Sequence, residues 1–198
     1  PDPEDRPVAT RETPLARAGE AAFLKVVDKN LHGAFLDWGL AGKDLFLPNR
    51  NQQGGIFAGR SYVVYVYVDD VTGRCVATNK LKSFVNNETL TVRPREEVDL
   101  LVASESEIGY RVVIDNRHWG MLYCNQLFRP VQVGDRLRGY VTKITDDHRI
   151  DVSLRQPGYA GVQDGADQLL GMLREAGGRL PLGDGSSPEE IHRRTQLS

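Results

Sequence analysis

HGAFLDWG, at residues 32–39, is the stretch that decides the fold, because it belongs to a pattern that occurs twice. In the first copy FLKVV at 23–27 precedes it, and a long apolar run at 61–68 and GRCVAT at 73–78 follow it. In the second copy VDLLV at 98–102 and GYRVVI at 109–114 are followed by a long run that ends at Ile144 and by RIDVSL at 149–154. Two copies are too few for a solenoid, so the repeat predicts two small β domains in tandem.

Each copy contains five short strand signals, which are β-branched and aromatic runs bounded by Gly, Asn and Asp. In the second copy we expect strands at about 98–105, 110–115, 118–123, 136–144 and 150–154. The long fourth strand follows a Val-Gly-Asp turn. This pattern predicts a mainly β protein built from five-stranded antiparallel barrels of the oligonucleotide-binding (OB) type.

The fourth strand of the first copy, at 61–68, is apolar on both faces. Val64 and Val66 alternate with Val63, Tyr65 and Tyr67. A strand of this kind needs cover on both sides. We therefore expect one face in the barrel core and the other packed on a neighbouring part of the chain.

The charge of the chain gives only a weak indication of its partner. The 198 residues have a net charge of −2, while residues 15–84 hold 9 Lys and Arg against 6 Asp and Glu. Residues 95–156 hold 9 against 10. The surplus in the first copy favours an anionic partner, and an ordinary solvated surface explains it equally well.

The residues offer no catalytic or metal-binding pattern. The four His do not fall at metal-ligand spacing, the Asp pairs lie in turns, and Ser186 and Ser187 have no partnered His nearby in the sequence. We expect no enzymatic activity, no metal and no cofactor.

The cysteines and the hydropathy pattern indicate the compartment. Cys75 and Cys124 are expected to be reduced thiols. No apolar run nears the 20 residues that a membrane span needs, so we expect a cytoplasmic protein without a membrane partner.

The two ends of the chain differ from the repeats. Leu169, Leu170 and Leu173 lie at helical spacing, and Ser187 with Pro188 is a typical helix start. The residues before 15 are either the end of an earlier copy or a leader. Because the chain starts at Pro1 without a Met, we expect it to be part of a longer protein.

The Gly-Ala-Phe-hydrophobic-Asp pattern, with Gly-Asp and a long strand after it, is similar to S1 RNA-binding domains. HGAFLDWG at 32–39, KDL at 43–45, YVY at 65–67, LPL at 180–182 and SSPEEI at 186–191 together resemble the conserved virulence factor B family. That family consists of bacterial proteins with successive S1 domains followed by a winged helix. The resemblance implies the end of an S1 domain or a leader at 1–14, S1/OB-type barrels at 15–84 and 95–157, a linker at 85–94, and the helical start of a winged-helix domain at 158–198.

The resemblance also implies an RNA site in each copy. S1 domains bind single-stranded RNA on one face of the barrel, where aromatic rings stack on bases and basic groups meet phosphates. In the first copy the family's positions hold His32, Phe35, Leu47, Asp69 and Arg74, and in the second Ile108, Arg111, Tyr123, Asp146 and Arg149. Leu47 cannot replace the family's polar His. The expected RNA-binding residues are His32, Phe35, Asp69, Arg74, Arg111, Tyr123, Asp146 and Arg149.

Several of these residues have a simpler interpretation. Phe35 alternates with Leu36, so one of the two must face the core. Asp69 and Arg74 flank a turn and could form an ordinary salt bridge, worth under about 1 kcal/mol. Trp38 and Trp119 could be stacking platforms, although half-buried caps of the barrels are more usual.

Three functions remain open from the sequence. The first is a bacterial post-transcriptional regulator, in the setting of virulence regulation, that binds single-stranded RNA without catalysis. The second is a protein-interaction module with eroded RNA sites, whose partner docks on Tyr65 and Tyr67. The third is the accessory RNA-binding part of a nuclease.

Overall fold

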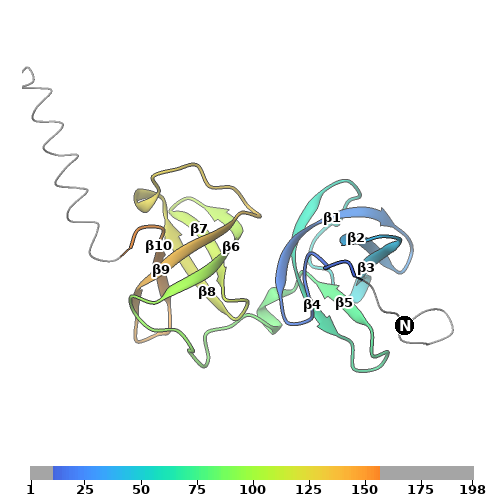
Figure 1. Cartoon of the computed structure of the whole chain (residues 1–198), viewed down its shortest axis with the longest axis horizontal. Helices are drawn as coiled ribbons and strands as arrows, with labels where there is room; N and C mark the ends of the chain where they lie inside the picture. Colours follow the sequence, from blue (N-terminus) through green and yellow to red (C-terminus); the bar gives the residue numbers. More distant parts are fainter. Residues whose placement is uncertain (1–10, 157–198) are drawn as a thin grey trace, which may run out of the picture. The chain divides into compact units, whose positions relative to one another are not determined.

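The computed structural model describes residues 11–156, so the expectations for residues 1–10 and for the winged helix at 158–198 lie outside the described residues. Two closed five-stranded barrels follow one another along the chain, which confirms the predicted fold class (Figure 1). The first barrel contains β1 (Ala21–Lys29), β2 (Gly33–Leu40), β3 (Lys43–Pro48), β4 (Ser61–Val68) and β5 (Cys75–Thr78). The second contains β6 (Glu97–Ser106), β7 (Gly109–Ile114), β8 (His118–Tyr123), β9 (Arg136–Ile144) and β10 (Ile150–Ser153). Three short 3₁₀ helices, η1 (Asn49–Asn51), η2 (Leu81–Ser83) and η3 (Cys124–Gln126), lie between strands.

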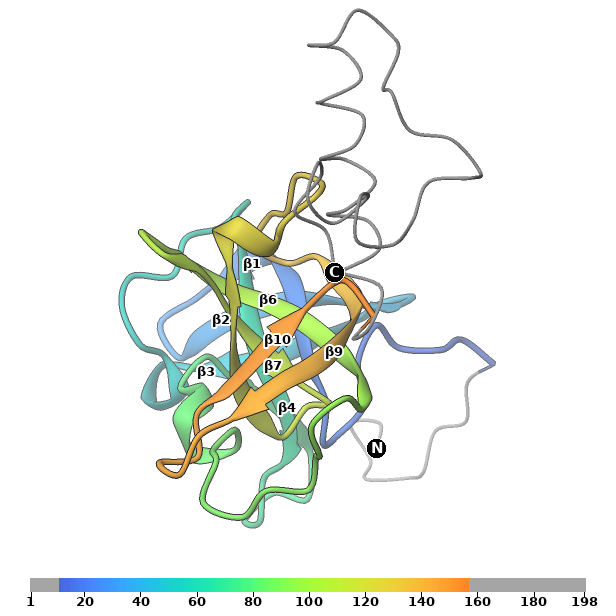
Figure 2. The ribbon, with the colours of Figure 1, turned by 90° about the vertical axis from the view of Figure 1, so that its left-hand side faces the viewer.

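One strand pair in each barrel is parallel. The first barrel closes in the order β1-β2-β3-β5-β4, and β3 pairs with β5 in parallel at Phe46 and Val76. In the second barrel β10 pairs with β8 in parallel and with β9 antiparallel, and β9 and β10 are seen side by side in Figure 2. A closed ring with an odd number of strands cannot be antiparallel throughout. The expected antiparallel barrel is therefore antiparallel at every pair except this one.

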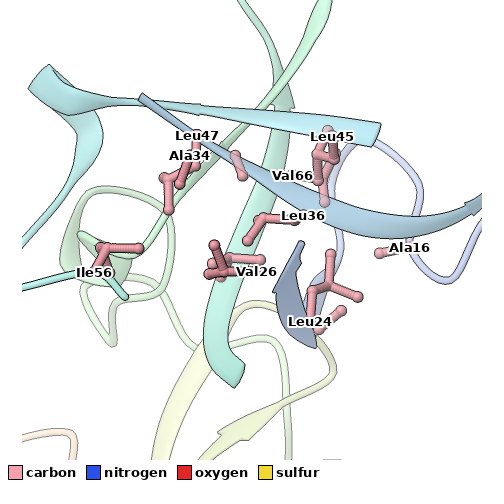
Figure 3. Close-up of a cluster of buried hydrophobic side chains, with 12 residues drawn as sticks. Ala16, Leu24, Val26, Ala34, Leu36, Leu45, Leu47, Ile56 and Val66 are labelled. Atoms are coloured by element: carbon pink, nitrogen blue, oxygen red, sulfur yellow. The ribbon is translucent and has the colours of Figure 1, made fainter. Parts of the chain in front are cut away.

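The core of the first barrel is built from alternate residues of its strands. Leu24 and Val26 of β1, Leu36 of β2 and Val66 of β4 are at most 2% exposed and converge on the barrel axis (Figure 3). Burial of each such side chain stabilises the fold by about 1.5–3 kcal/mol. Because Leu36 points inward, Phe35 must point outward, and the interpretation of Phe35 as a core residue is wrong.

The start of β2 approaches β3 so closely that only glycine fits there. A Cβ at Gly33 would lie 2.4 Å from the Leu47 carbonyl oxygen, and one at Gly109 would lie 2.2 Å from the Leu122 carbonyl oxygen. The two glycines therefore permit the tight strand pairing at the same point of both barrels.

The second face of β4 is covered, as the sequence predicts. Val63 belongs to a buried cluster that also holds Leu101 of β6 and Val113 of β7, both at most 3% exposed. Tyr65 packs against the same cluster.

Phe84, which follows η2, covers the rings of the two β4 tyrosines. Its ring centroid lies 4.7 Å from that of Tyr65 and 4.8 Å from that of Tyr67. Tyr67 also accepts a hydrogen bond of 2.8 Å from the Asn51 side chain. The contacts favour a packing role for Tyr65 and Tyr67 over the exposed docking patch that a protein partner would need.

Candidate nucleic-acid interface

The first barrel carries a cavity of about 740 Å³ on its β2–β3 side. The loops before β2 and between β4 and β5 form its rim, so segments far apart in sequence meet there. It includes all four residues predicted for this copy, and its lining consists of Asn30, His32, Phe35, Phe46, Pro48, Asn49, Arg50, Asp69, Thr72, Arg74, Cys75 and Val76. OB folds bind oligonucleotides at this face and these loops.

Two phenylalanines whose rings are tilted against each other line this cavity. Phe35 on β2 and Phe46 on β3 are register partners, and their ring centroids lie 5.2 Å apart. Both are half-buried, whereas Leu47 is fully buried in the core. β3 thus presents Phe46 and Pro48 to the cavity. The resemblance to S1 domains missed Phe46, because it assigned the outward position of this strand to Leu47.

Asp69 is a structural anchor of the cavity rim. Its carboxylate accepts hydrogen bonds from the Val71 and Thr72 amides and from the Thr72 hydroxyl, and it pairs with Arg50 at 2.6 Å. The Asp69 side chain is only 7% exposed, while that of Arg50 is 67% exposed. The Thr72 hydrogen bonds hold the pKa of Asp69 below its usual range, and Arg50 lowers it further.

The expected turn salt bridge between Asp69 and Arg74 is not formed. The carboxylate of Asp69 faces Arg50, and only the Asp69 amide contacts Arg74, through the Arg74 carbonyl at 2.9 Å. His32 and Arg74 are both exposed on the rim. The sequence did not point to Arg50, because it lies in η1, outside any motif, and its pairing with Asp69 becomes apparent only in the folded chain.

The second barrel carries a cavity of about 520 Å³ on the corresponding side. Three of its four predicted residues, Arg111, Tyr123 and Arg149, line it. Asp146 does not, and its neighbour Asp147 takes that place. The full lining is Lys82, Val85, Asn86, Asn87, Ile108, Arg111, Trp119, Gly120, Met121, Tyr123, Asp147, His148, Arg149, Ile150 and Asp151.

Arg111 and Trp119 form a stacked pair where the first barrel has Phe35. The guanidinium carbon of Arg111 lies 3.9 Å from the centre of the Trp119 ring. Burial lowers the pKa of Arg111, and a guanidinium remains charged at neutral pH. The indole Nε1 of Trp119 is buried and has no hydrogen-bond partner within residues 11–156. Trp119 is thus part of the cavity wall rather than only a cap.

Trp38 has the structural role expected of a cap. It packs on the core of the first barrel, and its indole nitrogen donates to the Ala16 carbonyl at 2.7 Å. It is not among the cavity residues.

Polar pairs line the rest of the second cavity. Arg149 pairs with Asp147 at 2.7 Å, and Asp147 also accepts a hydrogen bond from the Thr145 hydroxyl, which lowers the pKa of Asp147. The Tyr123 hydroxyl donates to Asp151 at 3.2 Å. Burial, with a further contribution from Asp151, raises the pKa of Tyr123, so its phenol stays a neutral donor.

Both cavities therefore combine flat π systems with cationic groups at the rim. This combination can stack on unpaired bases and contact phosphates. Among residues 11–156, no three His, Cys, Asp or Glu side chains gather as a metal site would require. That part of the chain also contains no helix that is long and apolar enough to cross a membrane.

Comparisons with known proteins support this class of function. The S1 domain family matches residues 18–80, and the CvfB-like winged helix domain family matches residues 167–198. The uncharacterized protein YitL of Bacillus subtilis is 23% identical over 208 residues, which cover 100% of this chain and 68% of YitL.

The solved structures that resemble this chain have low sequence identity and low TM-scores. A multidomain protein with nucleic acid binding domains from Streptococcus pneumoniae is 17% identical and has a TM-score of 0.43, with 94% of this chain and 68% of that chain covered. The Drosophila Unr CSD456 structure is 14% identical and has a TM-score of 0.25, with 69% and 62% covered. Because both TM-scores are below 0.5, the assignment rests on the two domain families. The chain thus matches an S1 domain and, after it, a CvfB-like winged helix domain, in the order expected for the conserved virulence factor B family, and the S1 match supports RNA binding.

Proposed function

We propose that the chain binds single-stranded RNA in both cavities and acts, without catalysis, as a bacterial post-transcriptional regulator in the cytoplasm. The observation that carries the proposal is the convergence of the expected side chains. In each barrel, residues from separate strands and loops line one cavity that pairs an aromatic floor with cationic groups.

The shape of the cavity floors favours unpaired bases over a duplex. Phe35 and Phe46 each present an aromatic ring, and the guanidinium of Arg111 lies over the Trp119 ring. Such groups stack on bases that are splayed out, whereas bases in an RNA duplex are already stacked on each other.

The roles of individual residues follow from their positions. Phe35 and Arg111 would stack on bases, and the Tyr123 hydroxyl, which donates to Asp151, would accept a hydrogen bond from a base edge. His32, Arg74 and Arg149 would meet phosphates, while Asp69 would position Arg50 and hold the β4–β5 turn. Asp146 is outside the cavity lining, and Asp147 would orient Arg149 in its place.

The test is a titration of labelled RNA with the 198-residue chain, followed by fluorescence anisotropy across a salt series. Single-stranded RNA should bind more tightly than the same sequence in a duplex, and its affinity should fall as salt rises, because phosphate contacts release counterions. Equal affinity for the duplex, or no binding near 50 mM salt, would overturn the proposal.

A further inference from the structure

The chain between the two barrels begins with a segment that is attached to the first cavity. We call residues 79–87 the bridge segment. The side chain of Asn79 exchanges two hydrogen bonds with the backbone of Gln53, at 2.6 and 2.9 Å. Lys80 donates from Nζ to the Arg50 carbonyl at 2.6 Å, and Arg50 lines the first cavity.

The middle of the bridge segment is packed and is not a free tether. Leu81 is 9% exposed and Val85 is fully buried, and both belong to the cluster that contains Val63 of the first barrel and Leu101 of the second. Phe84 stacks on the tyrosines of β4. A flexible linker would leave these apolar side chains in water.

The end of the bridge segment forms one wall of the second cavity. Asn87 accepts a hydrogen bond from the Trp119 amide at 2.8 Å, and it donates to the Trp119 carbonyl at 2.9 Å and to the His148 carbonyl at 2.7 Å. Lys82, Val85 and Asn86 line the same cavity. The second site is thus shared between a barrel and the chain that leads into it.

Hydrogen bonds outside the bridge segment also connect the barrels. The first residue of β1, Ala21, is fully buried. Its amide donates to the Asn116 side chain at 2.9 Å, and its carbonyl accepts from Arg136 at 2.7 Å. Because these contacts already hold the two barrels together, an RNA strand that occupies both cavities would lose less free energy to ordering two independent domains.

We propose that one RNA strand occupies both cavities and crosses the bridge segment, where Lys82 contacts its phosphate backbone. The proposal rests on the RNA binding proposed above. Lys82 is exposed, lines the second cavity, and pairs with no carboxylate within residues 11–156. A lysine ammonium on a long flexible stem suits a phosphate whose position varies with sequence.

The first experiment measures stoichiometry by isothermal titration calorimetry with the 198-residue chain. An OB-type module covers roughly 4 or more nucleotides, so we use an RNA of about 5 nucleotides and one of about 15. Two short strands but one long strand should bind each chain. Because the two sites are linked, the long strand should bind at least about 100-fold more tightly. Two long strands per chain would overturn the proposal.

The second experiment compares Lys82→Gln with Lys25→Gln, a substitution of an exposed β1 lysine outside both cavities. Loss of one phosphate contact should lower the salt slope for the long RNA by about 0.7 in Lys82→Gln and not in Lys25→Gln. In an Arg111→Ala background, which disables the second cavity, Lys82→Gln should leave short-RNA binding unchanged.

The outcomes separate the two proposals. If the long RNA binds Lys82→Gln with the unchanged slope while Phe35→Ala and Arg111→Ala still weaken binding, the proposed path of the strand over Lys82 is wrong and RNA binding stands. If short RNA does not respond to Phe35→Ala or Arg111→Ala, the RNA sites themselves are wrong.

Discussion

The guanidinium of Arg111 lies over the ring of Trp119, with its carbon 3.9 Å from the ring centre. Both side chains line the second cavity, so a base that enters it would meet the guanidinium. This arrangement replaces the aromatic residue that S1 domains have at this position, and it predicts a stacking role for a charged side chain.

Replacement of Arg111 by Ala should therefore weaken single-stranded RNA binding by about 5- to 150-fold, the equivalent of roughly 1–3 kcal/mol for one stacked base. Arg111→Lys should recover only part of the loss, because an ammonium has no flat face. Anisotropy titrations provide the measurement. Arg138→Ala, at a 67% exposed arginine of β9, is the matched control and should change affinity little. If Arg111→Lys bound as well as the native chain, charge alone would explain the site.

Trp119 offers a direct optical readout of the second cavity. In a Trp38→Phe variant, Trp119 is the sole tryptophan of the chain. RNA that stacks on Arg111 should change its emission, since the cation rests on the indole ring. An unchanged spectrum at saturating RNA would place the strand elsewhere.

Phe35→Ala should weaken RNA binding by about 1–3 kcal/mol through loss of a stacking surface. It should also reduce the free energy of unfolding by about 0.5–1.5 kcal/mol or somewhat more, because Phe35 packs on Phe46. Phe35→Leu serves to separate the two effects, since it keeps apolar bulk and removes the flat ring. The control is Phe57→Ala, at a 57% exposed phenylalanine outside the cavity. Equal binding by Phe35→Leu and the native chain would contradict a stacking role.

Asp69→Asn should loosen the β4–β5 turn and release Arg50. Because hydrogen bonds from Thr72 and the charge of Arg50 lower the pKa of Asp69 in the folded state, its contribution to stability is fully present above the unfolded value of 3.8. This contribution to stability is lost as the pH falls below 3.8 and passes the pKa of Asp69 in the folded state, which is lower. The difference in unfolding free energy between the native chain and Asp69→Asn should therefore be constant at neutral pH and shrink in acid. Urea unfolding at several pH values measures it, and a difference independent of pH down to about 2 would contradict this role.

Gly33→Ala should destabilise the first barrel by about 1–3 kcal/mol, since the new methyl group would lie 2.4 Å from a backbone oxygen that cannot move freely. Gly55→Ala is the control, because its closest neighbour is the ring edge of the exposed Phe57, which can turn away. Thermal unfolding of both variants tests the prediction. A Gly33→Ala chain as stable as Gly55→Ala would mean that β2 and β3 can separate at low cost.

The sequence predicted those parts of the fold that follow from alternation along a strand. Val64 and Val66 lie in the core, and Val63 packs against the second barrel, as a strand apolar on both faces requires. The β9 bounds agree with the predicted span, 136–144, because a Val-Gly-Asp turn fixes where that strand begins.

The candidate sites could be predicted only where a residue follows a motif. Phe35 is fixed by the Gly-Ala-Phe pattern, but Phe46 depends on the register between β2 and β3, which a single sequence does not reveal. Arg50 and Asn87 could not be found at all. Their roles depend on contacts with residues 19 and 32 positions away, and neither lies in a motif.

Asn87 sets the boundary of the second binding module. A protein cut to residues 95–157 would keep all five strands of that barrel and still lose the side chain that holds the backbone of Trp119 at both its amide and its carbonyl. The portable unit, for transplantation into another protein or for study in isolation, therefore starts at about residue 82, the first residue that lines the second cavity, and includes the chain that precedes the barrel.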